Sequence, residues 1–273
     1  MCSILGGTMG YLDDQVAAIT SPPRRPRSRI LWVLLIVVVV IAIVTLTAMQ
    51  AHLHTGHVTV VRAEGTLVTG LVDSSDSTGS EVIGNALRAA ADDPMTDAIV
   101  LRVNSPGGTP SAAEEIIGDI EYAKTKKPVV VSMGDIATSA AYLISVHADR
   151  IYANPDTFTA NIGTIWTFSN DSEWMKKKGY QVEVVKSGEM KDMGSSSRSL
   201  TTEERDYAQQ LVNASFESFI SDVLSHRPVN RTAIEDGRVI RGQEALDLGL
   251  VDKLGNLNDA EDAATDLART RSS

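Results

Sequence analysis

The chain has 273 residues, a formal net charge of −10 and 43% hydrophobic residues. This length suits one large domain or two small ones, and the acidic balance argues against nucleic-acid binding as the main function. The single cysteine, Cys2, excludes an intramolecular disulfide and a zinc site built from several cysteines.

The N-terminal residues differ in composition from the rest of the chain. Residues 1–29 are polar and end in a cluster of proline, arginine and serine, so we expect a disordered tail. Residues 30–49 carry no charge and are mostly apolar, and their number matches the thickness of a bilayer core. Because this stretch is too long for the apolar core of a typical signal peptide, we interpret it as an uncleaved transmembrane signal anchor.

The charges on either side of the apolar stretch predict an orientation. Four arginines precede it and only Arg62 follows closely, so the positive-inside rule places the N-terminus in the cytoplasm. Residues 1–29 have a net charge of +2, which leaves −12 for the remainder and fits a soluble domain that does not adhere to anionic lipid. We therefore expect a protein of the cell membrane with a cytoplasmic tail over 1–29, an anchor over 30–49, a juxtamembrane linker over 50–57 and an extracytoplasmic domain over 58–273.

Three histidines, His52, His54 and His57, follow the apolar stretch. The sequence offers them no carboxylate partner in a recognisable ligand pattern. We therefore interpret them as solvated side chains and predict no metal site there.

After residue 57, short apolar strands alternate with amphipathic helices. Strand patterns occur at residues 57–62, 97–103, 128–132, 150–153 and 180–185, with a strand or turn at 161–166 and a short strand and turn at 238–242. Helical patterns occur at residues 80–91, 111–126, 139–145, 172–178, 201–224, 243–248 and 257–268, and Ser111 with Glu114 predicts a capping box. This regular alternation predicts an α/β fold with a mainly parallel sheet.

Ser139 lies where the strand at 128–132 and a following turn give way to a helix. This position puts its hydroxyl beside unpaired backbone N–H groups and the positive end of a helix dipole. Such surroundings suit a nucleophilic serine, because negative charge develops beside it during acyl transfer. The alternative is that Ser139 is only the N-cap of the helix.

A second turn, residues 104–110, contains the adjacent glycines Gly107 and Gly108. Adjacent glycines after a strand can leave backbone N–H groups open to an anion, as in an oxyanion hole. Pro-Gly is also ordinary turn chemistry, so a purely structural turn is the alternative. The phosphate-binding Gly-x-x-x-x-Gly-Lys-Ser/Thr pattern is absent, which argues against a nucleotide site.

A nucleophilic serine requires a general base, and the histidines of the folded region do not fit. His147 is eight residues beyond Ser139 on the same predicted helix, about 12 Å along its axis, and His226 follows the long helix in a predicted loop. Lysine is the other option, since a neutral amine is a competent base once burial or nearby charge lowers its pKa. Lys186 and Lys191 are the candidates, and their spacing alone does not choose between them or exclude that both are solvated.

Several blocks, taken together in order, resemble the signal peptide peptidase A family, whose members are membrane-anchored serine proteases with a Ser/Lys dyad. The similarity extends from about residue 58 to 260, and no single block is decisive. The blocks are residues 60–67, 101–108, 134–139, 148–155, 161–165, 186–192, 202–205 and 236–252.

The resemblance implies a fold like that of Clp protease and crotonase, built from repeated ββα units. Ser139 matches the family's nucleophile and Lys191 its general base. Gly107 or Gly108 would supply an oxyanion N–H group, with Ala140 near enough to help. The resemblance also implies a homo-oligomeric ring or dome on the membrane, in which a subunit often supplies part of its neighbour's site, and it implies no metal or organic cofactor.

The chain departs from the family pattern directly after Ser139. Family members typically have two glycines there, whereas this chain has Ala140 and Ala141. If either position required a positive φ, alanine would cost about 1 kcal/mol or more.

The sequence therefore predicts a serine endopeptidase that cleaves apolar peptides near the membrane, such as cleaved signal peptides. A non-catalytic membrane scaffold or peptide-binding protein of the same fold is the alternative, and the alanine pair is its main support. A crotonase-like acyl-CoA enzyme is a third interpretation, against which the anchor and the Ser/Lys pair argue. Nucleic acid is not an expected partner.

Overall fold

The computed structural model describes residues 27–53 and 57–272, which belong to two compact units. The first unit contains helix α2 (Arg27–Leu53), which includes the predicted anchor segment. Within the described residues, no helix combines the length and the apolarity that a membrane crossing requires. The anchor over 30–49 stays a prediction. The tail over 1–29 falls largely outside the described residues, and the linker over 50–57 falls partly outside them, with its first residues in α2.

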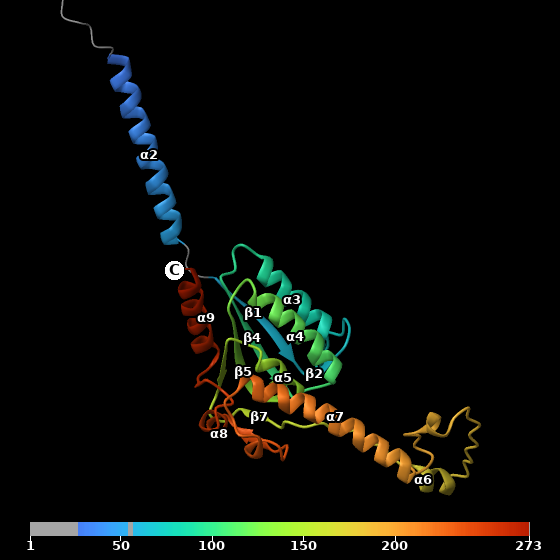
Figure 1. The fold of residues 1–273 in the computed structure, drawn as a ribbon. Coiled ribbons are helices and arrows are strands. Elements are labelled where there is room, and N and C mark those ends of the chain that lie inside the picture. The colour runs from blue at the N-terminus through green and yellow to red at the C-terminus, as the bar shows by residue number, and fades with distance from the viewer. Residues whose placement is uncertain (1–26, 54–56, 273) are drawn as a thin grey trace, which may run out of the picture. The chain divides into compact units, whose positions relative to one another are not determined.

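The second unit is built on a mainly parallel sheet, as predicted (Figure 1). Five strands pair in parallel in the order β1-β4-β5-β6-β9, and β7 pairs with the end of β5 and antiparallel with β8. Two further strands, β2 and β3, form a separate parallel pair. The bounds are β1 Val58–Glu64, β2 Thr66–Val68, β3 Ser77–Gly79, β4 Ala98–Ser105, β5 Val129–Thr138, β6 Arg150–Ala153, β7 Phe158–Ala160, β8 Val239–Arg241 and β9 Lys253–Leu254.

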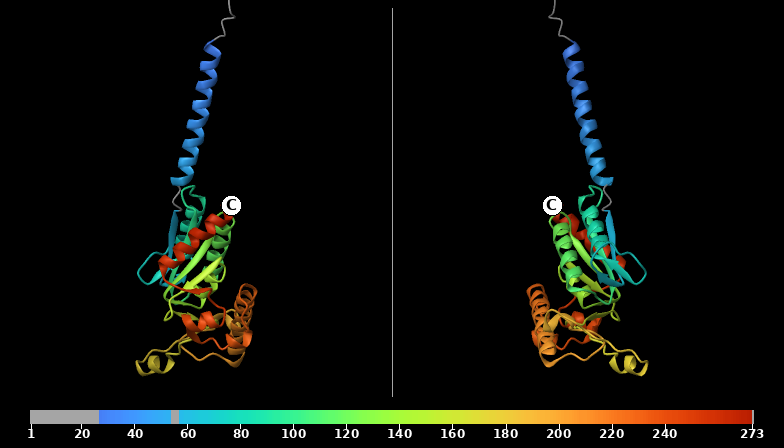
Figure 2. Two further views of the ribbon diagram at one scale, coloured as in Figure 1. Left: turned by 90° about the vertical axis from the view of Figure 1, so that its left-hand side faces the viewer. Right: turned by 90° about the vertical axis from the view of Figure 1, so that its right-hand side faces the viewer.

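Helices cover both faces of the sheet (Figures 1 and 2). Alternate residues of β4 point to opposite faces: Leu101 and Val103 belong to the large core, and Val100 belongs to a smaller core with α9. The large core lies under α3 (Ser80–Asp92), α4 (Pro110–Lys124) and α5 (Ala140–Ser145), and α9 spans Leu257–Ser272. Burial on both faces explains the continuous apolar runs at residues 98–101 of β4 and 129–131 of β5.

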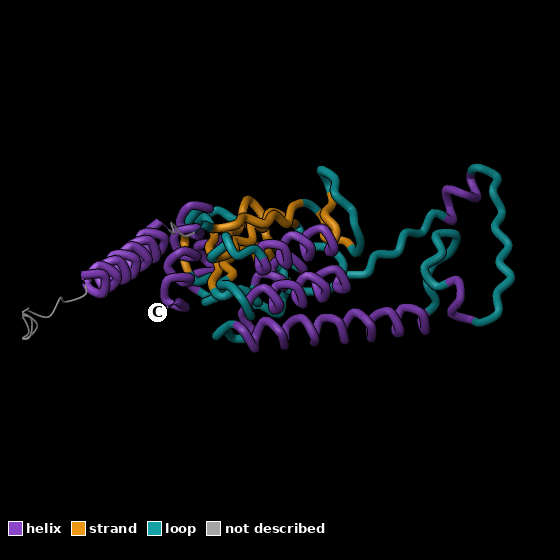
Figure 3. The backbone as a smooth tube through the Cα atoms, turned by 90° about the horizontal axis from the view of Figure 1, so that it is seen from above, coloured by secondary structure: helices purple, strands orange, loops and turns teal. Residues whose placement is uncertain are grey.

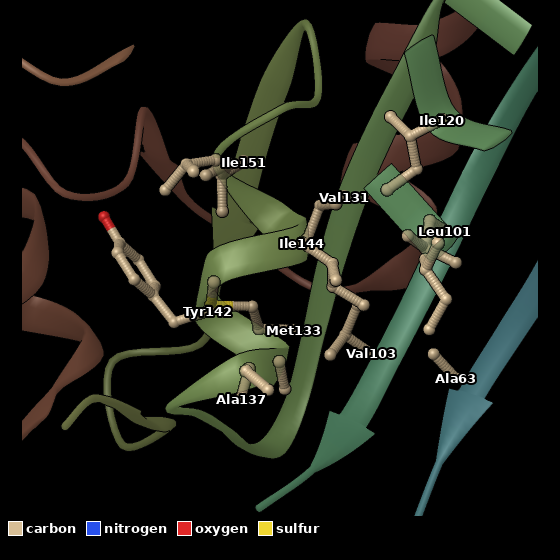
Figure 4. Close-up of a cluster of buried hydrophobic side chains, with 14 of the residues drawn as sticks. Ala63, Leu101, Val103, Ile120, Val131, Met133, Ala137, Tyr142, Ile144 and Ile151 are labelled. Carbon is tan, nitrogen blue, oxygen red and sulfur yellow. The ribbon is translucent and has the colours of Figure 1, made fainter. Parts of the chain in front are cut away.

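The large core packs directly beneath α5 (Figure 4). Ile144 of α5 lies against Val103 and Val131 of the sheet, and Tyr142 of the same helix is fully buried. The Tyr142 hydroxyl donates to the Leu250 carbonyl oxygen at 2.9 Å, and burial raises the pKa of its phenol well above the usual range. These contacts fix α5, and with it the residue that precedes it, to the sheet.

Helix α7 (Thr202–His226) differs between its two ends. It begins at a capping box in which Thr201 and Glu204 satisfy each other's backbone N–H groups. Its C-terminal half packs into the core through residues such as Phe219 and Val223. Residues 166–200, called the arm below, lie mostly as loop beyond its N-terminal end (Figure 3).

Three predicted elements differ in detail. The strand predicted at 180–185 is wrong: these residues are exposed and, in the part of the chain that is described, no strand pairs with them. Helix α4 is capped by Thr109 with Pro110 in its first turn, so Ser111 is not its cap. Strand β5 continues to Thr138, beyond the predicted end at residue 132, because its last residues pair with β7.

The shorter elements follow the sequence predictions more closely. Helix α6 covers Ser172–Lys177 within the arm, and α8 covers Gly242–Asp247. Short 3-10 turns occupy Glu189–Asp192 (η1) and Arg231–Ala233 (η2). Of these, η1 contains Lys191, one of the two candidate bases from the sequence.

Candidate active site

Ser139 forms a sharp turn between β5 and α5, at the strand-to-helix junction that the sequence predicts. Its backbone has φ 55° and ψ −126°, a conformation that costs a residue with a side chain roughly 1–3 kcal/mol. The Ser139 N–H group donates to the Ala160 carbonyl oxygen at 2.8 Å, which ties the turn to β7. In the described part of the chain its hydroxyl makes no capping bond to α5, so Ser139 is not a side-chain N-cap.

The Gly107-Gly108 turn lies against Ser139. A Cβ atom on Gly107 would stand 2.9 Å from the Ser139 Cβ atom, and Gly107 has φ +106°. Its N–H group donates to the Ser105 hydroxyl at 3.0 Å and is therefore occupied. The Gly108 N–H group has no hydrogen-bond partner among the described residues. The sequence did not choose between the two glycines as the source of an oxyanion N–H group. In the structure, Gly107 lets the turn pack closely against Ser139, and Gly108 has the backbone N–H group that, among the described residues, is free to donate.

Ala140 and Ala141 are ordinary helix residues. Both are buried in α5, and the residues with side chains that have positive φ in the described regions are Ser139, Ala160 and Asn161. The alanine pair therefore adds no backbone strain. As the first residue of α5, Ala140 has a backbone N–H group with no partner inside the helix, and Ala140 is one of the residues that line the pocket containing Ser139.

A strained turn at the end of β7 supports Ser139 and was not singled out from the sequence. Ala160 and Asn161 have φ values of 62° and 51°. The Asn161 side chain donates to the Gly237 carbonyl oxygen at 2.6 Å, which fixes the turn to the segment before β8. The one available signal was asparagine itself, which tolerates the left-handed region better than most residues.

A pocket of about 900 Å³ opens beside Ser139, and Gly107, Gly108 and Ala140 line it as well. Its apolar wall comes from α5, the 161–165 segment and the inner half of α7, with Leu143, Ile162, Val212, Phe216 and Phe219. Its charged lining is acidic, with Glu114, Asp222, Glu235 and Asp236. The pocket therefore favours apolar groups and disfavours acidic ones.

Lys191 is not among the residues that line this pocket. It is exposed in η1, within the arm. The arm is tied to the start of α7 by Arg198, whose guanidinium bridges Asp192 and Glu204 at 2.6–2.9 Å.

The length of α7 keeps the arm away from the pocket. The pocket residues of α7 begin at Val212 and include Phe219, which lie eight and fifteen residues beyond Glu204. These spacings correspond to about 12 Å and about 22 Å along the helix axis. The single chain thus does not bring Lys191 to Ser139.

The two candidate lysines differ in their surroundings. The Lys186 ammonium donates to Asp192 at 2.8 Å, and this bond raises the pKa of Lys186. A lysine held in its charged form cannot accept a proton. The Lys191 ammonium has no hydrogen bond or ion pair within the described residues, so Lys191 is the one left available.

The two histidines of the folded region do not join Ser139. Neither lines its pocket, and His226 is the last residue of α7 and not part of a loop as predicted. Their rings lie 4.3 Å apart and contact carboxylates instead of the serine. The geometry therefore agrees with the sequence in giving no Ser-His-Asp triad.

A parallel α/β core with a strained serine between strand and helix is an arrangement that occurs in hydrolytic enzymes. Residues 121–271 match the model of peptidase family S49, and the chain belongs to this family. This confirms the resemblance to signal peptide peptidase A proteins.

The family includes proteins much longer than the matched region. "Protease 4" of Haemophilus influenzae is 35% identical over 218 residues, which cover 78% of this chain and 35% of that protein. "Putative signal peptide peptidase SppA" of Enterococcus faecium is 34% identical over 183 residues, covering 65% and 53%. The chain thus spans between about a third and about half of these two relatives.

One solved structure aligns with most of the chain. It is a mutant of the "1510-N membrane-bound stomatin-specific protease", with a TM-score of 0.48 and 17% identity. The alignment covers 75% of this chain and 82% of that one.

Proposed function

We propose that the chain is a serine endopeptidase in which Ser139 is the nucleophile. The observation that carries the proposal is the strained Ser139 turn, which holds the hydroxyl at the mouth of a pocket. Backbone strain concentrates at functional sites because the surrounding structure must stabilise it. Here β7, the Gly107 turn and α5 do so from three sides.

The chemistry is acyl transfer through a Ser/Lys dyad. The Ser139 oxygen attacks the peptide carbonyl carbon while the neutral Lys191 amine accepts the hydroxyl proton. The Gly108 and Ala140 N–H groups stabilise the resulting oxyanion. Collapse of the tetrahedral intermediate releases the amine product, which takes up the proton from Lys191, and a water molecule then hydrolyses the acyl-enzyme. No step requires a metal or an organic cofactor.

Lys191 would reach the serine of a neighbouring subunit. The distance along α7 separates Lys191 from the serine of its own chain, and the arm exposes several large apolar side chains. Trp174, Tyr180, Val182 and Val185 are each more than half exposed, as expected of an interaction surface. Assembly into a homo-oligomeric ring or dome would cover them, and it would shield Lys191 from water, which disfavours its charged form.

The proposed substrates are peptides with apolar residues near the cleaved bond, such as cleaved signal peptides. The apolar wall of the pocket supports this choice, and its carboxylates argue against acidic residues at the same positions. We also retain the Clp protease/crotonase-like architecture and the membrane anchor over 30–49, with the catalytic unit outside the cytoplasm. The uncharged composition of that segment supports the anchor.

A non-catalytic scaffold is the second candidate, and its main support is now weaker. Ala140 and Ala141 occupy helical positions that alanine favours, so they do not distort the turn. Under the scaffold interpretation, the strained backbone at Ser139 would serve no catalytic function.

A serine-directed fluorophosphonate probe tests the proposal. We expect labelling of the assembled protein at Ser139, its loss in Ser139→Ala, and its retention in Ser218→Ala, which alters another serine of the same pocket. Labelling should also disappear in Lys191→Ala. An intact assembly that the probe does not label would favour the scaffold.

A further inference from the structure

A cluster of two histidines and two carboxylates lies beside the proposed peptidase site, and of its members only Asp222 lines the Ser139 pocket. Glu121 comes from α4, His147 follows α5, and Asp222 and His226 are one turn apart on α7. One possible ligand atom from each of Glu121, His147 and His226 lies within 4.8 Å of the other two. His147 is buried, whereas Glu121 and His226 are exposed, so the cluster is open to solvent on one side.

Asp222 contacts both imidazole rings. One carboxylate oxygen lies 3.0 Å from the His147 Nε2 atom, and the other lies 3.2 Å from the His226 Nδ1 atom. The His226 Nδ1 atom also faces the Asp222 carbonyl oxygen at 2.9 Å. Carbonyl and carboxylate oxygens only accept, and the Ser225 hydroxyl, 3.0 Å from the same Nδ1 atom, donates to the Asp222 carbonyl oxygen at 2.7 Å. Nδ1 of His226 therefore carries the hydrogen, and a neutral ring has its lone pair on Nε2.

The same reasoning places two hydrogen-bond acceptors against each other at His147. If its Nε2–H group donates to Asp222, its Nδ1 atom has a lone pair, and this atom faces a Glu121 carboxylate oxygen at 3.0 Å. Two acceptors at that distance repel each other unless a proton or a metal ion lies between them. A carboxylate that orients histidines through their second nitrogen is the usual outer support of a metal site.

We propose that Glu121, His147 and His226 bind a divalent transition-metal ion of the zinc class, with Asp222 orienting both histidines. Two imidazoles and a carboxylate suit Zn²⁺ and leave a fourth position for water. The ion would join α4, the end of α5 and the end of α7. Because Asp222 also lines the Ser139 pocket, the ion would fix the pocket wall without taking part in the chemistry.

Lys124 is the competing cation. Its ammonium donates to the His147 carbonyl oxygen at 2.5 Å and lies 3.6 Å from a Glu121 carboxylate oxygen. It therefore lowers the affinity of the site without occupying it. The Lys124→Met substitution should tighten metal binding.

The test is equilibrium binding of Zn²⁺ to the full chain, with Co²⁺ as a spectroscopic probe, by titration against a competing chelator. We expect one tight site, visible absorption typical of tetrahedral Co²⁺ and a higher Tm with metal than with chelator. His226→Ala should abolish this binding, and Asp222→Asn should weaken it by about 10–100-fold.

The matched control is His57→Ala, which removes an exposed histidine outside the cluster and should leave binding unchanged. Three results would overturn the proposal: no metal binding, binding that survives His226→Ala, or binding lost in His57→Ala. All these readouts are independent of peptidase activity.

Discussion

The Ser139 pocket and the arm are built in opposite ways. Ser139 is held by a sheet strand, a glycine turn and a buried helix, and its strained backbone is surrounded by core. The arm has no core of its own among the described residues and is held to α7 mainly by charged side chains around Arg198. Under the proposed mechanism, one chain would complete the nucleophile half of the site and leave the base half to assembly.

The largest effect should come from the two lysines of the arm. Lys191→Ala removes the proposed base and should lower kcat/KM by about 10²–10⁴-fold. Lys186→Ala should have a much smaller effect, because Lys186 is committed to Asp192. Steady-state cleavage of an apolar fluorogenic peptide measures both. Equal losses in the two variants would show that the arm acts only as a structural unit.

The next effect tests the pocket side. Gly107→Ala places a Cβ atom 2.9 Å from both the Ser139 Cβ atom and the Thr138 carbonyl oxygen, at φ +106°. We expect loss of probe labelling and a lower Tm, with a cost of more than about 1 kcal/mol.

The matched control for this substitution is Gly118→Ala, at an exposed position in α4 where a Cβ atom has no neighbour within 4 Å. It should stabilise the protein by about 0.5–1 kcal/mol and leave labelling unchanged. If Gly107→Ala behaves like Gly118→Ala, the close packing of the turn against Ser139 is not required.

The smallest effect concerns the arm at acid pH. The hydrogen bond from Arg198, followed by that from the Thr201 N–H group, lowers the pKa of Glu204 from 4.5 to about 2. The pKa of Glu204 is lower in the folded protein than in the unfolded chain, so the ionised Glu204 stabilises the folded state. This contribution is complete above about pH 4.5 and is lost as the pH falls through about 2.

Hydrogen exchange of the arm across this pH range measures the loss. Arg198→Ala should loosen the arm at neutral pH and reduce its acid dependence. The control Arg62→Ala breaks an exposed pair with Glu64 and should change neither. A parent arm that is as ordered at low pH as at neutral pH, or that is no more ordered than the Arg198→Ala arm at neutral pH, would contradict this account.

Much of the sheet-and-helix core follows from the sequence, because each strand or helix there buries a periodic apolar face. The strand predicted at 180–185 is wrong because composition alone does not make a strand. Its residues have a strand-like composition, but in the described chain no neighbouring strand pairs with them. The composition of a segment does not show whether another part of the chain, or another molecule, provides a strand that pairs with it.

The candidate site was only partly predictable. Ser139 and the two glycines could be singled out because strand ends and glycine turns are local features. The turn at Ala160 and Asn161 depends on bonds to Gly237 and Arg238, far along the chain. The convergence of His147 with His226 likewise depends on how α7 packs, since they lie on separate elements.

Mixing Ser139→Ala with Lys191→Ala subunits tests the central claim most directly. Each variant alone should be inactive, since each assembly lacks one member of the dyad. In a ring where neighbours complete each other's sites, random mixing should restore about a quarter of the parent activity. Mixed assemblies that form fully and show no recovered activity would contradict a base supplied by the neighbouring subunit.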